Sequence, residues 1–209
     1  MTKTLLHVVT MLFDWDDSLL ATSRCYDETW AEKLYRGFKR NLTIDFDFIV
    51  FTDRIRQFNE PIIQELMTVS EPGYGKFTEP YRLNEAMIFC GLDTVVLQNV
   101  DHLAEYCLSQ TKIALSRNPY QPDQCINPVA LVPPGHAHVF HTWNGENDME
   151  WLRTFDVNYI DDLFPGQLLS LKFHDVRRKG TQDANIVYFH GNHKPHQLLH
   201  LPWVKEHWR

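Results

Sequence analysis

The segment 186–195, IVYFHGNHKP, carries residue types that suit the binding of a charged ligand. Its apolar start predicts a buried strand, and His190, Gly191 and Lys194 follow it within five residues. Imidazole is a common ligand of divalent metals, glycine lets the backbone approach a ligand closely, and lysine neutralises phosphate. The combination suits a diphosphate with a metal ion. It also fits a solvated loop with surface histidines, and the residues alone leave both interpretations open.

A second chemical feature is a single carboxylate, Asp93, within an apolar stretch that runs from Ala86 to Leu97. Carboxylates are rarely buried unless they are paired or bound to a metal. Asp93 would either accept a hydrogen bond from a backbone N–H at a strand end or supply an oxygen ligand to Mg²⁺ or Mn²⁺. Because His190 also follows an apolar strand, the two side chains could share one ion.

Three further side chains are candidates for ligand binding, and two of them, Asp148 and Arg82, also have a structural interpretation. Asp148 lies among acids in the predicted helix 145–155, where it either complements the helix dipole or serves as an acceptor-binding or catalytic carboxylate. Tyr26 could stack on a planar base. Arg82 either reaches a phosphate or pairs with a glutamate on its own predicted helix.

Several other kinds of site lack their sequence motifs. The chain contains no GxSxG, GxGxxG or GxxxxGK[ST], so hydrolase, Rossmann dinucleotide and P-loop functions are not supported. The C-terminal histidines have near-helical spacing, but no cysteine or carboxylate accompanies them at zinc-ligand spacing.

The elements that must position these residues alternate between strands and helices. Strands are predicted at 4–12 and 45–54, in the stretch 89–101 that contains Asp93, at 129–132, after a turn within 163–173 and at the start of 185–200. Helices are predicted at 25–40, 59–67, 79–89 and 145–155. Such alternation indicates a largely parallel sheet covered by helices, and ligands bind such sheets outside the carboxyl ends of the strands. We therefore expect three polar groups to lie near one another: the loop that begins at Phe13, the pair Thr52-Asp53 and the pair Asp93-Thr94.

Composition narrows the class of protein. The 209 residues suit one domain, and 44% hydrophobic residues predict a real core. A net charge of −7 without a basic block disfavours a nucleic-acid partner. The four cysteines are scattered, which favours free thiols in a reducing compartment. Since no segment is long enough for a membrane span, no integral membrane segment is expected, and a cytoplasmic location follows as the default.

Taken in order, these pieces resemble the GT-A-fold glycosyltransferases that use nucleotide sugars. The closest resemblance is to the family 8 (glycogenin- and galactosyltransferase-like) group and related bacterial and phage proteins. The matching segments are HVVTML, Tyr26 with the helix ending YRGFKRN, FIVFTDR, the YRL before the central strand, GLDTVVLQNVDHL, CINPVALVP, the acid at Asp148 and FHGNHKP. The resemblance implies an α/β fold with a mixed, mainly parallel central sheet flanked by helices. It implies a single GT-A-like domain over 1–209, with a nucleotide-binding half at about 1–100 and an acceptor-side half at about 101–209.

The resemblance also implies a metal site, although this chain departs from the family's pattern of metal ligands at two positions. The family's central strand ends in Asp-x-Asp, which binds Mn²⁺ or Mg²⁺ and the sugar nucleotide, whereas this chain has Gly91-Leu92-Asp93 and keeps only the second acid. A C-terminal histidine completes the family's site, three residues before a glycine, but Tyr188 stands there in this chain. His190 points to the same face of the predicted strand and is the expected substitute.

The remaining roles follow from the same resemblance. Asn127 matches the asparagine that lines the family's sugar pocket, although Pro128 follows it here. The expected catalytic or acceptor-side residues are Asp148 and Asn127, the expected metal ligands are Asp93 and His190, and the expected nucleotide-binding residues are Thr10, Tyr26, Asp53, Lys76, Arg82, Gly191 and Lys194.

The sequence leaves three functions open. The first is a metal-assisted glycosyltransferase that moves a sugar from a UDP-sugar or similar donor to a saccharide or other hydroxyl acceptor, with retention of configuration implied by the resemblance. The second, favoured by Gly91, is a non-catalytic nucleotide-sugar-binding protein. The third is a nucleotidyltransferase on a similar α/β sheet. The absence of a Gly/Arg/Lys-rich loop after the first strand argues against this third function.

Overall fold

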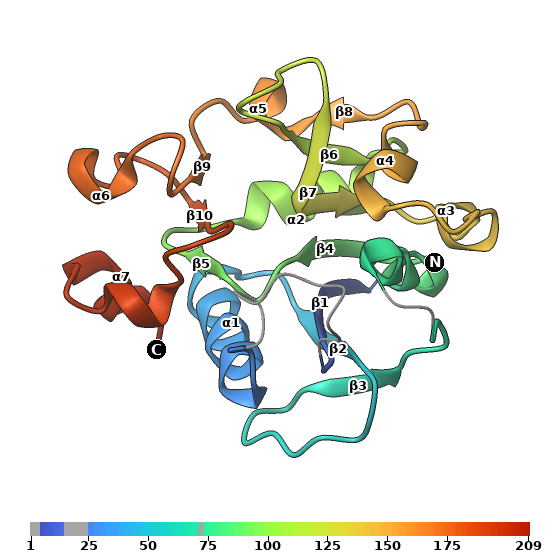
Figure 1. Ribbon diagram of the computed structural model, residues 1–209, viewed down its shortest axis with the longest axis horizontal. Coiled ribbons are helices and arrows are strands. Elements are labelled where there is room, and N and C mark those ends of the chain that lie inside the picture. Colours follow the sequence, from blue (N-terminus) through green and yellow to red (C-terminus); the bar gives the residue numbers. More distant parts are fainter. Residues whose placement is uncertain (1–4, 15–24, 71–72) are drawn as a thin grey trace.

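The computed structural model describes residues 5–14, 25–70 and 73–209, and Figure 1 shows its ribbon. Thr4 and most of the first polar loop, at 15–24, lie outside these residues. The strands are β1 (Leu6–Leu12), β2 (Phe46–Thr52), β3 (Ile63–Leu66), β4 (Ala86–Cys90), β5 (Thr94–Val96), β6 (Ala114–Arg117), β7 (Cys125–Val132), β8 (Asn158–Tyr159), β9 (Leu168–Ser170) and β10 (Ile186–Tyr188). The helices are α1 (Glu28–Asn41), α2 (Asp101–Ser109), α3 (His138–His141), α4 (Asp148–Leu152), α5 (Ile160–Leu163), α6 (Val176–Lys179) and α7 (Pro202–His207), with 3₁₀ helices η2 (Tyr74–Leu83) and η3 (Pro195–Leu198).

The strands of the described residues form two sheets. The larger sheet has the order β3-β2-β1-β4-β7-β6-β8, and the smaller has the order β5-β10-β9. Neighbours from β3 to β4 are parallel, β7 is antiparallel to both β4 and β6, and β8 is parallel to β6. This confirms the predicted mixed, mainly parallel central sheet flanked by helices.

The side chains of β1 alternate between two cores because successive residues of a strand point to opposite faces. Leu6 and Val8 belong to a cluster with residues of α1 and α2. Val9 and Met11 belong to a second cluster with residues of η2, α3 and α4. All seven residues of β1 are buried, which explains why the strand reads as a continuous apolar run.

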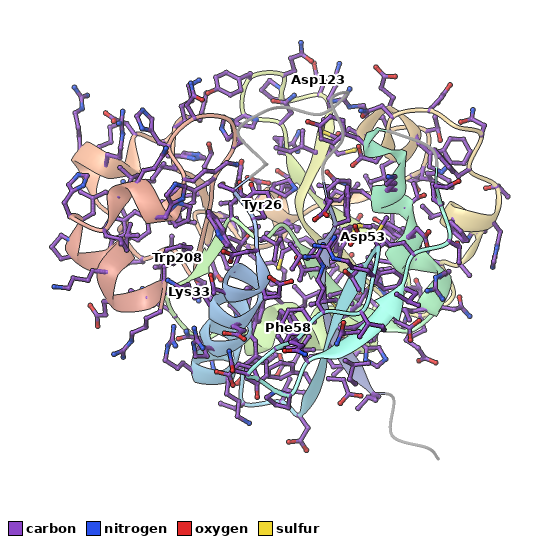
Figure 2. All side chains as sticks on the ribbon, turned by 60° about the horizontal axis from the view of Figure 1, so that its bottom comes forward. Tyr26, Lys33, Asp53, Phe58, Asp123 and Trp208 are labelled. Atoms are coloured by element: carbon purple, nitrogen blue, oxygen red, sulfur yellow. The ribbon has the colours of Figure 1, made fainter. Side chains whose placement is uncertain are left out.

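Helix α1 begins after a capping aspartate, and the C-terminal helix α7 packs against it. The Asp27 carboxylate accepts the backbone N–H of Thr29 at 3.0 Å, which satisfies one of the free donors of the first turn. The rings of Trp30 and Trp208 pack edge to face at 4.9 Å, so α7 lies against α1, as Figure 1 also shows. Lys33 extends over Trp208, with its ammonium 3.7 Å from a ring centroid, and the two are neighbours in Figure 2.

Two helix predictions are wrong. The segment 59–67 contains the strand β3, which pairs with β2 and is anchored because the Gln64 amide exchanges hydrogen bonds with the backbone of Arg56 at 2.8 and 2.9 Å. The segment 79–89 is split, since η2 ends before Asn84, whose φ of 60° is left-handed, and β4 follows. A short apolar run fits a buried strand or a helix equally well, and only its neighbours β1 and β7 decide.

None of the four cysteines, all of which the structure describes, forms a disulfide. Among the described residues, no helix combines the length and the apolar character that crossing a bilayer requires.

Candidate functional site

A cavity of about 370 Å³ opens beyond the carboxyl ends of β1 and β4. Segments from both sheets line it, namely Met11, Tyr26, Tyr74, Phe77, Phe89, Gly91, Leu92, Asp93, Asn118, Pro119, Tyr120, Ile126, Asn127, Pro128, Asp148, Met149, Tyr188, Phe189, His190, Gly191 and Lys194. The volume lies within the range of ordinary ligand pockets, and its walls combine aromatic faces with a few polar groups. Seven of the eleven residues predicted for the site contribute to it: Tyr26, Asp93, Asn127, Asp148, His190, Gly191 and Lys194.

Strand pairing explains why residues distant in sequence meet here. The antiparallel register of β5 and β10 sets Thr94 opposite Tyr188, so Asp93 lies beside the residues that follow β10. The Phe189 N–H donates to the Asp93 carbonyl at 3.1 Å and fixes this approach. On the other side, the Gly91 N–H donates to the Pro128 carbonyl at 3.1 Å, which brings the start of β7 to the same turn.

The Asp93 carboxylate is held by two donors from other segments. Its Oδ2 accepts the Tyr26 hydroxyl at 2.8 Å and forms an ion pair with the Lys194 ammonium. The side chains of Lys194 and Asp93 are only 6% and 14% exposed. Low exposure makes such a pair costly to break, because removal of one partner leaves the other charge buried.

His190 borders the same cavity but already has a partner. Its Nε2 lies 2.9 Å from the Ser170 hydroxyl, and its ring lies 6.0 Å from the ring of Tyr120. Burial lowers the pKa of the His190 imidazole, the charge of Lys172 lowers it further, and Asp93 opposes both. Burial thus favours the neutral form of the ring.

The lining residues fit a divalent metal poorly. Within the described parts of the chain, no group of three or more His, Cys, Asp or Glu side chains could hold an ion. Asp93 is engaged by an ammonium, and residue 91 is a glycine where the resembling family has its first carboxylate. The prediction of Mn²⁺ or Mg²⁺ at Asp93 and His190 stays a prediction.

A buried acid and an amide form a second polar group that lines the cavity. The Asn127 amide donates to Asp148 Oδ2 at 2.5 Å, and Asp148 is only 3% exposed. Burial raises the pKa of Asp148 to about 6, against the lowering effect of the hydrogen bonds from Asn127 and the Met149 backbone. Its Oδ1 has no hydrogen-bond partner among the described residues. This buried oxygen retains the capacity to accept a hydrogen bond.

Gly191 has a conformational reason for its place. Its φ of 64° is left-handed, a conformation that costs a side chain about 1 kcal/mol or more. The backbone turns there between β10 and Lys194, so the glycine directs the chain back to the cavity.

Four predicted nucleotide-binding residues do not line the cavity, and their assignment stays a prediction. Thr10 is completely buried within β1. Asp53 pairs with Arg56 at 2.8 Å, and Figure 2 shows it apart from Tyr26. Arg82 pairs with glutamates of β3 and its own helix, as one sequence interpretation allowed. The Lys76 ammonium lies 5.2 Å from the ring of Phe13.

The aromatic walls of the cavity and one polar neighbour of His190 were not predicted from the sequence. Tyr74, Phe77 and Tyr120 line the cavity, and Ser170 holds His190. Tyr120 lies in a Pro-rich turn, NPYQPDQ, whose exposed aromatic ring is a cue that the sequence does offer.

Comparisons with known proteins place the fold. No protein-family model matches the sequence, and no curated protein does either. Solved structures do. The bifunctional glycosyltransferase WbbM matches with a TM-score of 0.58 and 10% identity over 97% of this chain and 51% of its own. The glycosyltransferase GlyE from Streptococcus pneumoniae TIGR4 matches with a TM-score of 0.57 and 12% identity over 92% and 56%.

The galactosyltransferase LgtC, solved with donor and acceptor sugar analogues, matches with a TM-score of 0.54 and 8% identity over 90% of this chain and 88% of its own. The chain thus spans about half the length of WbbM and GlyE and most of LgtC. These similarities confirm the predicted GT-A-like glycosyltransferase fold. The family 8 assignment itself stays a prediction.

Proposed function

We propose that this chain is a glycosyltransferase that binds a nucleotide-diphosphate sugar, with a UDP-sugar as the expected donor, in the cavity beyond β1 and β4. The acceptor would be a saccharide or another molecule with a free hydroxyl. The observation that carries the proposal is the cavity itself, which puts the buried Lys194 ammonium at the edge of a GT-A-like sheet where ligands of α/β folds bind.

The polar groups of the cavity suit the two ends of such a donor. Lys194 would stabilise the negative charge that develops on the departing nucleoside diphosphate. Asp148 and Asn127, joined by their hydrogen bond, would hold hydroxyls of the transferred sugar. The aromatic walls at Tyr74 and Tyr120 would pack against planar or apolar parts of the ligand.

The step itself would be a displacement at the anomeric carbon. The acceptor oxygen forms a bond to that carbon, the bond to the diphosphate oxygen breaks, and the acceptor proton passes to an oxygen of the departing diphosphate. With retention, the acceptor approaches the face of the sugar from which the diphosphate departs. Positioning the two reactants against each other is the main contribution of the protein. Retention, which the sequence resemblance implies, would appear as the same anomeric configuration in donor and product.

A second candidate is a non-catalytic nucleotide-sugar-binding protein. Two observations favour it: Gly91 replaces an acid of the family motif, and Asp93 is already paired with Lys194. Such a protein would bind a donor and leave it intact.

A thermal-shift panel of nucleotide sugars, followed by a nucleoside-diphosphate release assay with candidate acceptors, tests the proposal. A ligand that binds only the folded state raises Tm. A rise in Tm with sugar transfer supports the glycosyltransferase, and a rise without donor cleavage supports the binding protein. If no nucleotide sugar changes Tm, both candidates fail.

A further inference from the structure

The cavity pairs a lysine with Asp93, the acid that matches the second aspartate of the resembling family's metal-binding motif. Lys194 reaches Asp93 across 101 residues of sequence and forms an ion pair with Oδ2. The same ammonium lies 5.3 Å from the centre of the Tyr26 ring, whose hydroxyl donates to the same oxygen. Ring, carboxylate and ammonium therefore form one packed unit, which we call the Lys194 cluster.

The Lys194 cluster opposes a divalent cation on electrostatic grounds. A cation bound at Asp93 would lie next to the ammonium, and two positive charges at such separation repel strongly where water is excluded. The first carboxylate that could offset this repulsion is absent, because residue 91 is a glycine. The Nε2 of His190 is already hydrogen-bonded to Ser170 at 2.9 Å.

The same cluster suits an anion. An ammonium carries three donors, so one hydrogen bond to Asp93 leaves two for a ligand. The backbone of Lys194 is fixed in turn, since its N–H donates to the Gln197 side chain at 3.0 Å at the start of η3. Lysine binds phosphate as a point charge, and in this site the contacts with neighbouring residues fix the orientation of the Lys194 side chain.

We propose that this site binds the diphosphate of its donor through Lys194 without a divalent cation, and that Asp93 is a positioning residue for Lys194 rather than a metal ligand. The inference rests on the proposed function, since it concerns the nucleoside diphosphate portion of the same donor. A glycine at 91 then fits, because the site has no second carboxylate to accommodate.

Substitution of Gly91 offers a way to make nucleotide binding depend on a divalent cation. A Cβ built on Gly91 would lie 3.1 Å from Oδ1 of Asp93, so a side chain there needs only a small movement of that carboxylate. Gly91→Asp would thus place a second acid beside Asp93 and create the oxygen pair that Mn²⁺ prefers.

Calorimetric titration of the full chain with ADP, CDP, GDP and UDP, in EDTA and in Mn²⁺ at equal ionic strength, tests the inference. The tightest nucleotide is expected to bind with Kd values that agree within about threefold between the two conditions, a difference below 1 kcal/mol. Gly91→Asp is expected to bind that nucleotide more tightly in Mn²⁺ than in EDTA. A wild-type Kd that weakens tenfold or more in EDTA and recovers with Mn²⁺ would overturn the inference and leave the proposed function standing.

Substitution of Lys194, with a matched control, checks that this residue carries the binding. Lys194→Met should weaken binding about tenfold to a hundredfold in both conditions, because charged hydrogen bonds are worth about 1.5–3 kcal/mol. Lys205→Met removes an exposed lysine of α7 and serves as the matched control. If Lys194→Met fails to fold, Asp93→Asn with Lys194→Met removes both charges together and should fold with the same loss. Unchanged affinity in the folded variant would overturn the inference, and failure of all four nucleotides to bind the wild type would overturn the proposed function as well.

Discussion

Replacement of Asp148 by asparagine should change how the stability of the protein depends on pH. Asp148 is 3% exposed, and burial raises its pKa from the ordinary 3.8 to about 6. Between these two values the folded protein holds the proton and the unfolded chain does not. The stabilisation from the protonated acid is therefore complete below pH 3.8 and is lost as the pH rises to about 6.

The size of the effect follows from the displacement of the pKa. One pKa unit corresponds to 1.36 kcal/mol, so the move from 3.8 to about 6 is worth about 3 kcal/mol. The amide introduced by Asp148→Asn would keep an oxygen for the Asn127 side chain and would carry no titrating proton. Any change in that hydrogen bond shifts the variant's stability equally at all pH values, so the slope isolates the acid.

Urea unfolding of the wild type and Asp148→Asn between pH 4 and 7 provides the measurement. The difference in unfolding free energy should move by about 2–2.5 kcal/mol in favour of the variant as the pH rises over this range, because the unfolded carboxyl is already partly ionised at pH 4. Asp183→Asn, which alters an exposed carboxylate, should follow the wild type in parallel. Parallel curves for Asp148→Asn and the wild type would refute the assignment of a raised pKa to Asp148.

Two further substitutions probe the frame around the site. Gly75→Ala should lower the free energy of unfolding by about 1–3 kcal/mol, because a Cβ at Gly75 would lie 2.0 Å from a ring carbon of Trp143; an unchanged urea midpoint would contradict this packing. Asp27→Ala should cost about 1 kcal/mol in the same assay, since it removes the side-chain cap of α1, and equal stability of variant and wild type would show that the cap contributes nothing.

Much of the fold could be predicted because it follows from local patterns. The continuous burial of β1, the helical spacing of α1 and the acidic start of α4 are each visible in the sequence. The segment around β3 was not predictable in this way, since its strand character depends on pairing with β2 and on the contact of Gln64 with Arg56. That contact belongs to tertiary structure.

The site shows the same division. Strand ends and the glycine turn identified Asp93, His190, Gly191 and Lys194 as neighbours, and the structure brings all four to one cavity. The sequence could not show that Lys194 occupies the carboxylate of Asp93 itself, because the pair spans 101 residues. The identity of a polar residue also does not show whether it lines the cavity or forms an ion pair elsewhere, as Asp53 does with Arg56.

The most direct measurement is a crystal structure of the chain with the nucleoside diphosphate that binds most tightly. We expect the diphosphate to lie in the cavity beyond β1 and β4, with a phosphate oxygen within hydrogen-bond distance of Lys194 Nζ. A diphosphate bound outside this cavity, or one in it that makes no contact with Lys194, would contradict the central claim.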